Sequence, residues 1–152
     1  MNTKLYFGYG MNTNLVEMAY RCPGARSRGP ARLLNHAFRF ATHADVVAAE
    51  GSYVDGVLWS VTDACLAKLD ALEGFPHYYN RREMAVEHDG DVKNAIVYFM
   101  NPGVPDALPY QSYFDLVMEG YTQHQVPTDQ LYNALDVCPV LTENISSSII
   151  TA

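Results

Sequence analysis

The feature that most limits what this chain can fold into is an aromatic strand near its start that runs directly into a turn with two glycines. Residues 6–12 read Tyr-Phe-Gly-Tyr-Gly-Met-Asn, and we predict a strand over residues 4–9. Glycines at positions 8 and 10 have no Cβ, so the backbone can bend there and a ligand can approach it closely. Asn12 or Asn14 can cap a helix over residues 15–21, whose free N–H groups favour a carboxylate, a phosphate or a developing oxyanion. The turn is therefore a candidate anion cradle, and the alternative is a plain strand-to-helix connection that binds nothing.

The spacing of these glycines does not match a nucleotide site. Thr13 stands where the third glycine of a dinucleotide fingerprint would let the helix pack closely on the strand. The chain also has no Gly-x-x-x-x-Gly-Lys-Ser/Thr pattern, so a site for a nucleoside triphosphate is not indicated.

Length and charge narrow the class of protein. The chain has 152 residues and a formal net charge of −7. We expect one domain over residues 1–152, in which the last ten residues, rich in Ser and Thr, form a flexible tail. The negative charge disfavours binding to nucleic acid or to an anionic membrane surface, so we expect small-molecule partners. The sequence leaves the oligomeric state open.

The distribution of apolar and cysteine residues predicts a cytoplasmic protein. No apolar run approaches the roughly 18 residues of a membrane span, and the start lacks the basic-then-apolar pattern of a signal peptide. The odd set of Cys22, Cys65 and Cys138 has no disulfide-like or metal-like spacing, which indicates reduced thiols. The histidines are spread out in the same way, so we expect no metal site.

Hydrophobic periodicity and turn residues predict an α+β fold. We expect strands over residues 4–9, 31–42 (one strand or two), 54–61, 78–88 and 92–100, the last two joined through Asp89-Gly90. Helices are expected over residues 15–21, 110–120 and 128–135, and between Thr62 as cap and Gly74 as stop, with Leu66, Leu69 and Leu72 as its apolar positions. This order indicates a small, mixed, largely antiparallel sheet closed on itself as a barrel, with helices packed outside.

Two carboxylates on the helix between Thr62 and Gly74 are candidates for acid/base chemistry. Asp70 and Glu73 lie three residues apart, and Glu73 is in the last turn, immediately before Gly74. The negative end of the helix dipole disfavours a carboxylate there and raises its pKa, which suits a group that takes and returns a proton. Glu73 is therefore the better candidate; the alternative is that both are solvated surface charges. Covalent catalysis has no evident residue, because Cys65 falls on an apolar helix face and no Gly-x-Ser-x-Gly elbow occurs.

Three motifs resemble the gamma-glutamylcyclotransferase-like family. Tyr9-Gly10-Met11-Asn12 is similar to the family's Tyr-Gly-Ser-Asn loop, and Met18 and Arg21-Cys22-Pro23-Gly24-Ala25 follow at family-like spacing. Gly56-Val57-Leu58-Trp59 leads into Leu69-Asp70-x-x-Glu73-Gly74, which looks like the segment with the family's catalytic glutamate. The third and weaker match is residues 109–120, which contain Tyr113. The motifs lie in the family's order over roughly residues 4–120.

The resemblance implies a small closed β-barrel and cleavage of a gamma-glutamyl amide by its own α-amine, which leaves 5-oxoproline and needs no cofactor. Glu73 would be the catalytic base and then the acid. Backbone N–H groups of the turn would hold the substrate carboxylate and the oxyanion, and Tyr113 could close the pocket with its hydroxyl, although an aromatic at helical spacing is more often packing. The predicted substrate-binding residues are Tyr6, Phe7, Gly8, Tyr9, Gly10, Met11, Asn12 and Tyr113.

One position departs from the family pattern. Met11 replaces the usual Ser, which removes a hydroxyl and keeps the backbone N–H. This change bears on substrate identity more than on reaction type, and the leaving group could be an amino acid, an amine, a peptide or a carrier-bound acyl group. The competing hypothesis is a non-catalytic module that binds small acidic ligands in the same cavity, which a carboxylate at position 73 argues against.

Overall fold

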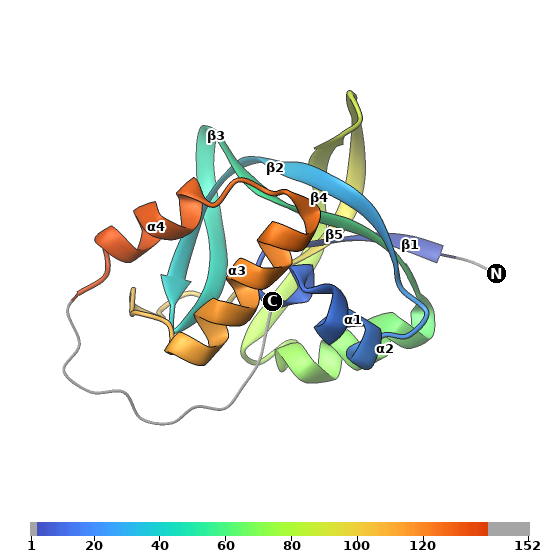
Figure 1. Cartoon of the computed structure of the whole chain (residues 1–152), viewed down its shortest axis with the longest axis horizontal. Coiled ribbons are helices and arrows are strands. Elements are labelled where there is room, and N and C mark those ends of the chain that lie inside the picture. Colours follow the sequence, from blue (N-terminus) through green and yellow to red (C-terminus); the bar gives the residue numbers. More distant parts are fainter. Residues whose placement is uncertain (1–2, 140–152) are drawn as a thin grey trace.

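A computed structural model describes residues 3–139, in which five strands close into a barrel (Figure 1). Around the barrel the order is β1-β3-β2-β4-β5, and β5 returns alongside β1. Every pair is antiparallel except β1 and β5, which run parallel where Tyr6 meets Ile96. The strands are β1 (Thr3–Gly8), β2 (Arg26–Ala41), β3 (His43–Thr62), β4 (Tyr79–His88) and β5 (Asp91–Met100). This confirms the predicted closed, mixed and largely antiparallel sheet.

The two longest strands, β2 and β3, form one hairpin that supplies much of the barrel wall (Figure 1). The strands predicted from the sequence were too short here, since they covered only residues 31–42 and 54–61. The structure turns at a single residue, Thr42, whose φ of 70° lies in the left-handed region. The stretch from 49 to 53 has no buried residue, so it carried no apolar pattern that could mark it as strand.

Helices pack outside the barrel (Figure 1). A 3-10 turn, η1 (Met11–Thr13), follows β1 and leads into α1 (Leu15–Arg21), and α2 (Asp63–Glu73) follows β3. The chain then continues from the β4–β5 hairpin into α3 (Gln111–His124) and α4 (Asp129–Asp136). No helix among residues 3–139 is long and apolar enough to cross a membrane. The predicted Ser/Thr-rich tail lies outside the described residues.

Helix α2 begins and ends where the sequence predicts. The Thr62 Oγ1 accepts a hydrogen bond from the Cys65 N–H at 3.1 Å. Gly74 ends the helix with a left-handed φ of 67°, a conformation that glycine adopts without a Cβ clash. The predicted apolar face is partly wrong, because Leu72 is 40% exposed. The buried face consists of Cys65, Leu66, Leu69 and Glu73.

Buried tyrosines tie separate parts of the barrel together through main-chain carbonyls. The Tyr9 hydroxyl, just after β1, donates to the Tyr98 carbonyl of β5 at 2.6 Å. The Tyr121 hydroxyl of α3 donates to the Tyr9 carbonyl, and the Tyr79 hydroxyl of β4 donates to the Ala44 carbonyl of β3, each at 2.6 Å. A buried phenol needs such a partner, so these contacts fix α3 and the turn after β1 against the sheet.

A glycine allows α3 to touch the turn after β1 directly. A Cβ built on Gly120 would lie 2.7 Å from the backbone nitrogen of Asn14, a distance at which something must shift. This close approach places α3 directly on the end of η1. By contrast, a Cβ on Gly24 would meet its nearest neighbour, a Thr62 methyl, at an ordinary 3.8 Å.

We predict that Gly120→Ala destabilises the protein by about 1–3 kcal/mol, the usual cost of overpacking. Gly24→Ala is the matched control and is expected to change stability by less than about 0.5 kcal/mol. Urea denaturation of both variants measures the difference. Equal stability of the two variants would mean that α3 is not seated on η1 as described.

Candidate active site

The predicted base, Glu73, is the last residue of α2 and is fully buried. It stands four residues after Leu69 and therefore lies on the same face of the helix as the core-facing leucines. A carboxyl group thus occupies a position that the helical pattern would assign to an apolar residue. The interpretation of Glu73 as a solvated surface charge is wrong.

Asn12 connects the turn after β1 to this carboxyl group. Its amide Nδ2 lies 3.2 Å from the Glu73 Oε2 and 2.9 Å from the Tyr6 hydroxyl, and donates to both. Its Oδ1 accepts a hydrogen bond of 2.8 Å from the Arg21 Nη1. Asn12 is itself fully buried, so all these bonds form away from bulk water.

Burial raises the pKa of the Glu73 carboxyl well above its ordinary value of 4.5. The Arg21 charge and the Asn12 hydrogen bond act in the opposite direction, and the Asp70 charge adds to the rise. The sequence predicted the same direction from the helix dipole, but removal from water is the larger cause. The site therefore holds a carboxyl group with a strong affinity for a proton.

Asp70, the other candidate carboxylate, already has two partners. Its Oδ1 accepts a hydrogen bond of 2.6 Å from the Tyr98 hydroxyl. The same oxygen lies 2.9 Å from the Arg81 Nε, an ion-pair contact that lacks hydrogen-bond geometry. Sequence reasoning missed Tyr98 and Arg81, because both lie on the β4–β5 hairpin and meet α2 only in the folded barrel.

The predicted turn residues do not all face Glu73. The ring of Phe7 packs against Gly56 of β3, where a Cβ would lie 2.6 Å from the ring. The Met11 sulfur lies 2.9 Å from the Arg21 Nη2, so this side chain turns toward α1. Gly8 lets the turn fold back on itself, since a Cβ there would sit 3.0 Å from the Asn12 carbonyl oxygen. Gly10 precedes η1 with φ −119° and ψ −127°.

The start of α1 is not the anion cradle that the sequence suggested. Asn14, not Asn12, caps the helix, and its Oδ1 accepts hydrogen bonds from the Val16 and Glu17 N–H groups. The Leu15 N–H donates to the Gln123 side chain at 2.7 Å. These helix donors are occupied by the protein itself, so a cradle would have to come from the turn over residues 8–12.

Tyr113 of α3 is close enough to Glu73 for the charge of this carboxylate to affect the Tyr113 pKa. Its hydroxyl accepts a hydrogen bond of 3.1 Å from the Ala44 N–H, and burial together with the Glu73 charge raises its pKa. The His43 ring packs edge-on against it at 5.1 Å, and burial lowers the His43 pKa to about 4. His43 was not predicted as a neighbour of the site. It is a neutral group at physiological pH.

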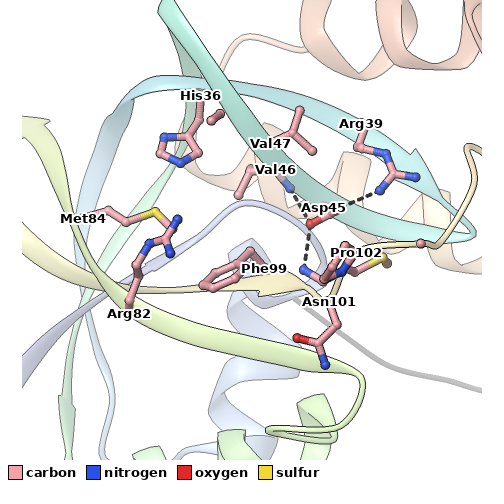
Figure 2. Close-up of a pocket in the computed structure, with 13 residues that line it drawn as sticks. His36, Arg39, Asp45, Val46, Val47, Arg82, Met84, Phe99, Asn101 and Pro102 are labelled. Carbon is pink, nitrogen blue, oxygen red and sulfur yellow. Dashed lines mark hydrogen bonds and ion pairs between the residues drawn. The ribbon is translucent and has the colours of Figure 1, made fainter.

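A separate pocket of about 360 Å³ opens where β2 and β3 cross β4 and β5 (Figure 2). Its lining includes Arg82 and Phe99, which the β4–β5 register places on the face opposite Arg81 and Tyr98. None of the predicted site residues lines this pocket. Within residues 3–139, no group of three or more His, Cys, Asp or Glu side chains could hold a metal ion.

Comparison with known proteins identifies relatives of this fold. The family model described as gamma-glutamyl cyclotransferase, AIG2-like matches residues 6–120. A solved gamma-glutamyl cyclotransferase is 23% identical with a TM-score of 0.81, over 97% of this chain and 94% of that chain. The uncharacterized human protein loc79017 is 23% identical with a TM-score of 0.81, over 97% and 95%. YkqA from Bacillus subtilis is 21% identical with a TM-score of 0.78, over 91% of this chain and 56% of YkqA. No curated protein matches the sequence.

The buried carboxyl predicts a pH-dependent effect of Glu73→Gln on stability. Because folding raises the pKa of Glu73, its contribution to stability is present below about pH 4.5 and is lost as the pH rises toward the folded value. The neutral amide has no such loss. Glu73→Gln should therefore match the wild type at low pH and become the more stable protein at neutral pH, as measured by thermal midpoints across the pH range. A constant difference at every pH would contradict the burial.

Proposed function

The chain belongs to the gamma-glutamyl cyclotransferase, AIG2-like family, and from this premise we propose that it cleaves gamma-glutamyl amides by intramolecular cyclisation. The α-amine of the glutamyl group attacks its own γ-carbonyl, the carbonyl–nitrogen bond breaks, and 5-oxoproline leaves together with an amine or amino acid. Attack within one molecule needs the chain of the substrate to be folded into a ring. Holding that conformation can supply several kcal/mol of the barrier.

Glu73 carries the proton in this proposal. Its carboxylate takes a proton from the substrate ammonium, which frees the electron pair that attacks the γ-carbonyl. The same carboxyl then gives this proton to the leaving nitrogen, and the ring nitrogen loses its second proton to the released amine, so the enzyme ends the cycle unchanged. A raised pKa fits both halves of this transfer, because a strongly acidic carboxyl would hold the ammonium proton poorly.

The turn over residues 8–12 is the proposed substrate-binding segment. Its last residue, Asn12, is fully buried, and the Asn12 side chain touches the Glu73 carboxyl. Backbone N–H groups of this turn would hold the substrate carboxylate and the oxyanion of the tetrahedral intermediate. Main-chain donors are the same whether position 11 is Met or Ser, so the methionine is compatible with the reaction. Tyr113 would bound the site from α3.

The observation that carries the proposal is the contact between Asn12 and Glu73. It brings together a segment near the start of the chain and the end of α2, 61 residues later, in the fully buried part of the molecule. A module that only bound acidic ligands would gain nothing from a buried carboxylate beside its binding turn.

We predict that incubation with gamma-glutamyl amides yields 5-oxoproline as the first product and that N-acetylation of the substrate abolishes reaction. The acetyl group removes the attacking electron pair and leaves the γ-carbonyl intact. Chromatography of the products from a panel of gamma-glutamyl dipeptides and amines tests both statements and identifies the leaving group. Free glutamate as the first product, or cleavage of the acetylated compound, would rule out cyclisation.

We predict that Glu73→Gln lowers kcat by roughly 10²- to 10⁴-fold, the usual cost of losing a general base, with substrate affinity nearly unchanged. The amide keeps the shape of the side chain and cannot carry the proton. Asp70→Asn is the control on the same helix and should be milder, since Asp70 is engaged by Tyr98 and Arg81. Steady-state kinetics of both variants decide the assignment, and an inactive Asp70→Asn beside an active Glu73→Gln would reverse it.

A further inference from the structure

Arg21, the last residue of α1, contacts the side-chain amide of Asn12, which in turn contacts the proposed base Glu73. Its Nη1 donates to the Asn12 Oδ1 at 2.8 Å, and its Nη2 lies 2.9 Å from the Met11 sulfur. The side chain is only 12% exposed. The Glu17 carboxylate, one turn earlier on α1, lies 3.8 Å from the guanidinium. Arg21 is thus held between its own helix and the turn after β1.

The chemistry of a guanidinium determines which way the Asn12 amide points. Arginine has donors and no acceptor, so the Asn12 oxygen must face Arg21. The two N–H groups of the amide then face the opposite side, where they reach Tyr6 and Glu73. A flipped amide would place its NH₂ against the guanidinium and its oxygen against the Glu73 carboxyl, and the resulting donor–donor and acceptor–acceptor contacts would be unfavourable.

We propose that Arg21 is a positioning residue that locks the Asn12 amide so that it donates to Glu73 and holds this carboxyl in one orientation for proton transfer. In this proposal Arg21 acts on Glu73 through Asn12 and takes no part in the bond making and breaking itself. The inference rests on the proposed function, because it assigns a role within the same site.

The charges around Glu73 favour this arrangement. Arg21 is the cation that lowers the Glu73 pKa, against the larger effect of burial and the smaller effect of Asp70. Within residues 3–139, six phenols also feel the charge of Glu73, and they stay neutral because burial raises their pKa values: Tyr6, Tyr9, Tyr78, Tyr79, Tyr98 and Tyr113. Removing Arg21 therefore takes away both the lock on Asn12 and the nearby positive charge.

The experiment compares Arg21→Met and Arg21→Lys with Arg28→Met. Arg21→Met removes the charge and the donors, and Arg21→Lys keeps the charge on an ammonium that cannot present the planar two-nitrogen fork. Arg28 is exposed and its guanidinium donates a long hydrogen bond of 3.4 Å to the Ser60 hydroxyl, so Arg28→Met controls for the change in net charge. The first readout is the titration of the Glu73 carboxyl by ¹³C NMR, assigned as the resonance that Glu73→Gln lacks. The second is the pH profile of kcat/KM.

We expect Arg21→Met to move the Glu73 titration and the acidic limb of the profile to higher pH and to lower kcat/KM by roughly 10- to 100-fold, the range of a charge-assisted hydrogen bond. Arg21→Lys should keep much of the titration and recover little of the rate. Arg28→Met should match the wild type in both readouts. If Arg21→Met titrates like Arg28→Met, or if Arg21→Lys recovers the full rate, Arg21 does not position Asn12.

The Asn12→Leu variant, which lacks the side-chain amide, separates a positioning effect of Arg21 from a direct effect of its charge. In Asn12→Leu the lock has no target, so adding Arg21→Met should lower kcat/KM much less than it does in the wild type. An equal loss in both backgrounds would overturn the inference. The NMR titration needs no substrate, so a shift without any turnover of gamma-glutamyl amides would refute the proposed function while leaving the link from Arg21 to Glu73 intact. Turnover of gamma-glutamyl amides together with an unshifted Glu73 titration in Arg21→Met would support the proposed function and refute the link from Arg21 to Glu73.

Discussion

The site depends on one buried carboxyl group whose position is determined from two directions. The helix α2 brings Glu73 inward at its last residue, and the turn after β1 meets it with the Asn12 amide. Since β1 pairs with β3 on one side and with β5 on the other, this turn is placed only when the barrel is closed. Removing a carboxyl group from water costs free energy, and the closed barrel is what keeps Glu73 buried despite this cost. The proton affinity of Glu73 is therefore a property of the whole barrel.

Local signals in the sequence determined much of the fold. Asn12 or Asn14 as cap predicted the start of α1, where the structure has Asn14, and Thr62 and Gly74 predicted both ends of α2, because caps and stops depend on neighbouring residues only. Asp89 and Gly90 adopt φ values of 52° and 83° in the turn between β4 and β5, as that dipeptide indicates. The turn at Thr42 gave no such signal, since a threonine with positive φ is held there by the surrounding structure.

Individual residues of the candidate site could be predicted from the sequence, but the contacts between them could not. Glu73 and the turn over residues 6–12 were identified from the helix end, the glycines and the family resemblance. The spacing of Leu69 and Glu73 also contained a signal of burial, because residues four apart share a helix face. Arg21 as a partner of Asn12, and Tyr98 as a partner of Asp70, arise from contacts between elements, which a single sequence does not encode locally. The same reason explains why the donors of α1 were expected to be open to a ligand.

The tyrosines that tie the barrel together also give the protein an internal optical reporter. Burial raises the pKa values of Tyr9, Tyr79 and Tyr121 well above 10, so these phenols stay neutral in alkaline solution while the barrel is closed. Ionised phenol absorbs at longer wavelength than the neutral form. With added base, the absorbance of solvated tyrosines therefore changes first and reversibly, and the absorbance of the buried tyrosines changes only when the sheet opens. An absorbance titration with base thus records the opening of the barrel without a label, in the same pH range where these groups cease to stabilise it.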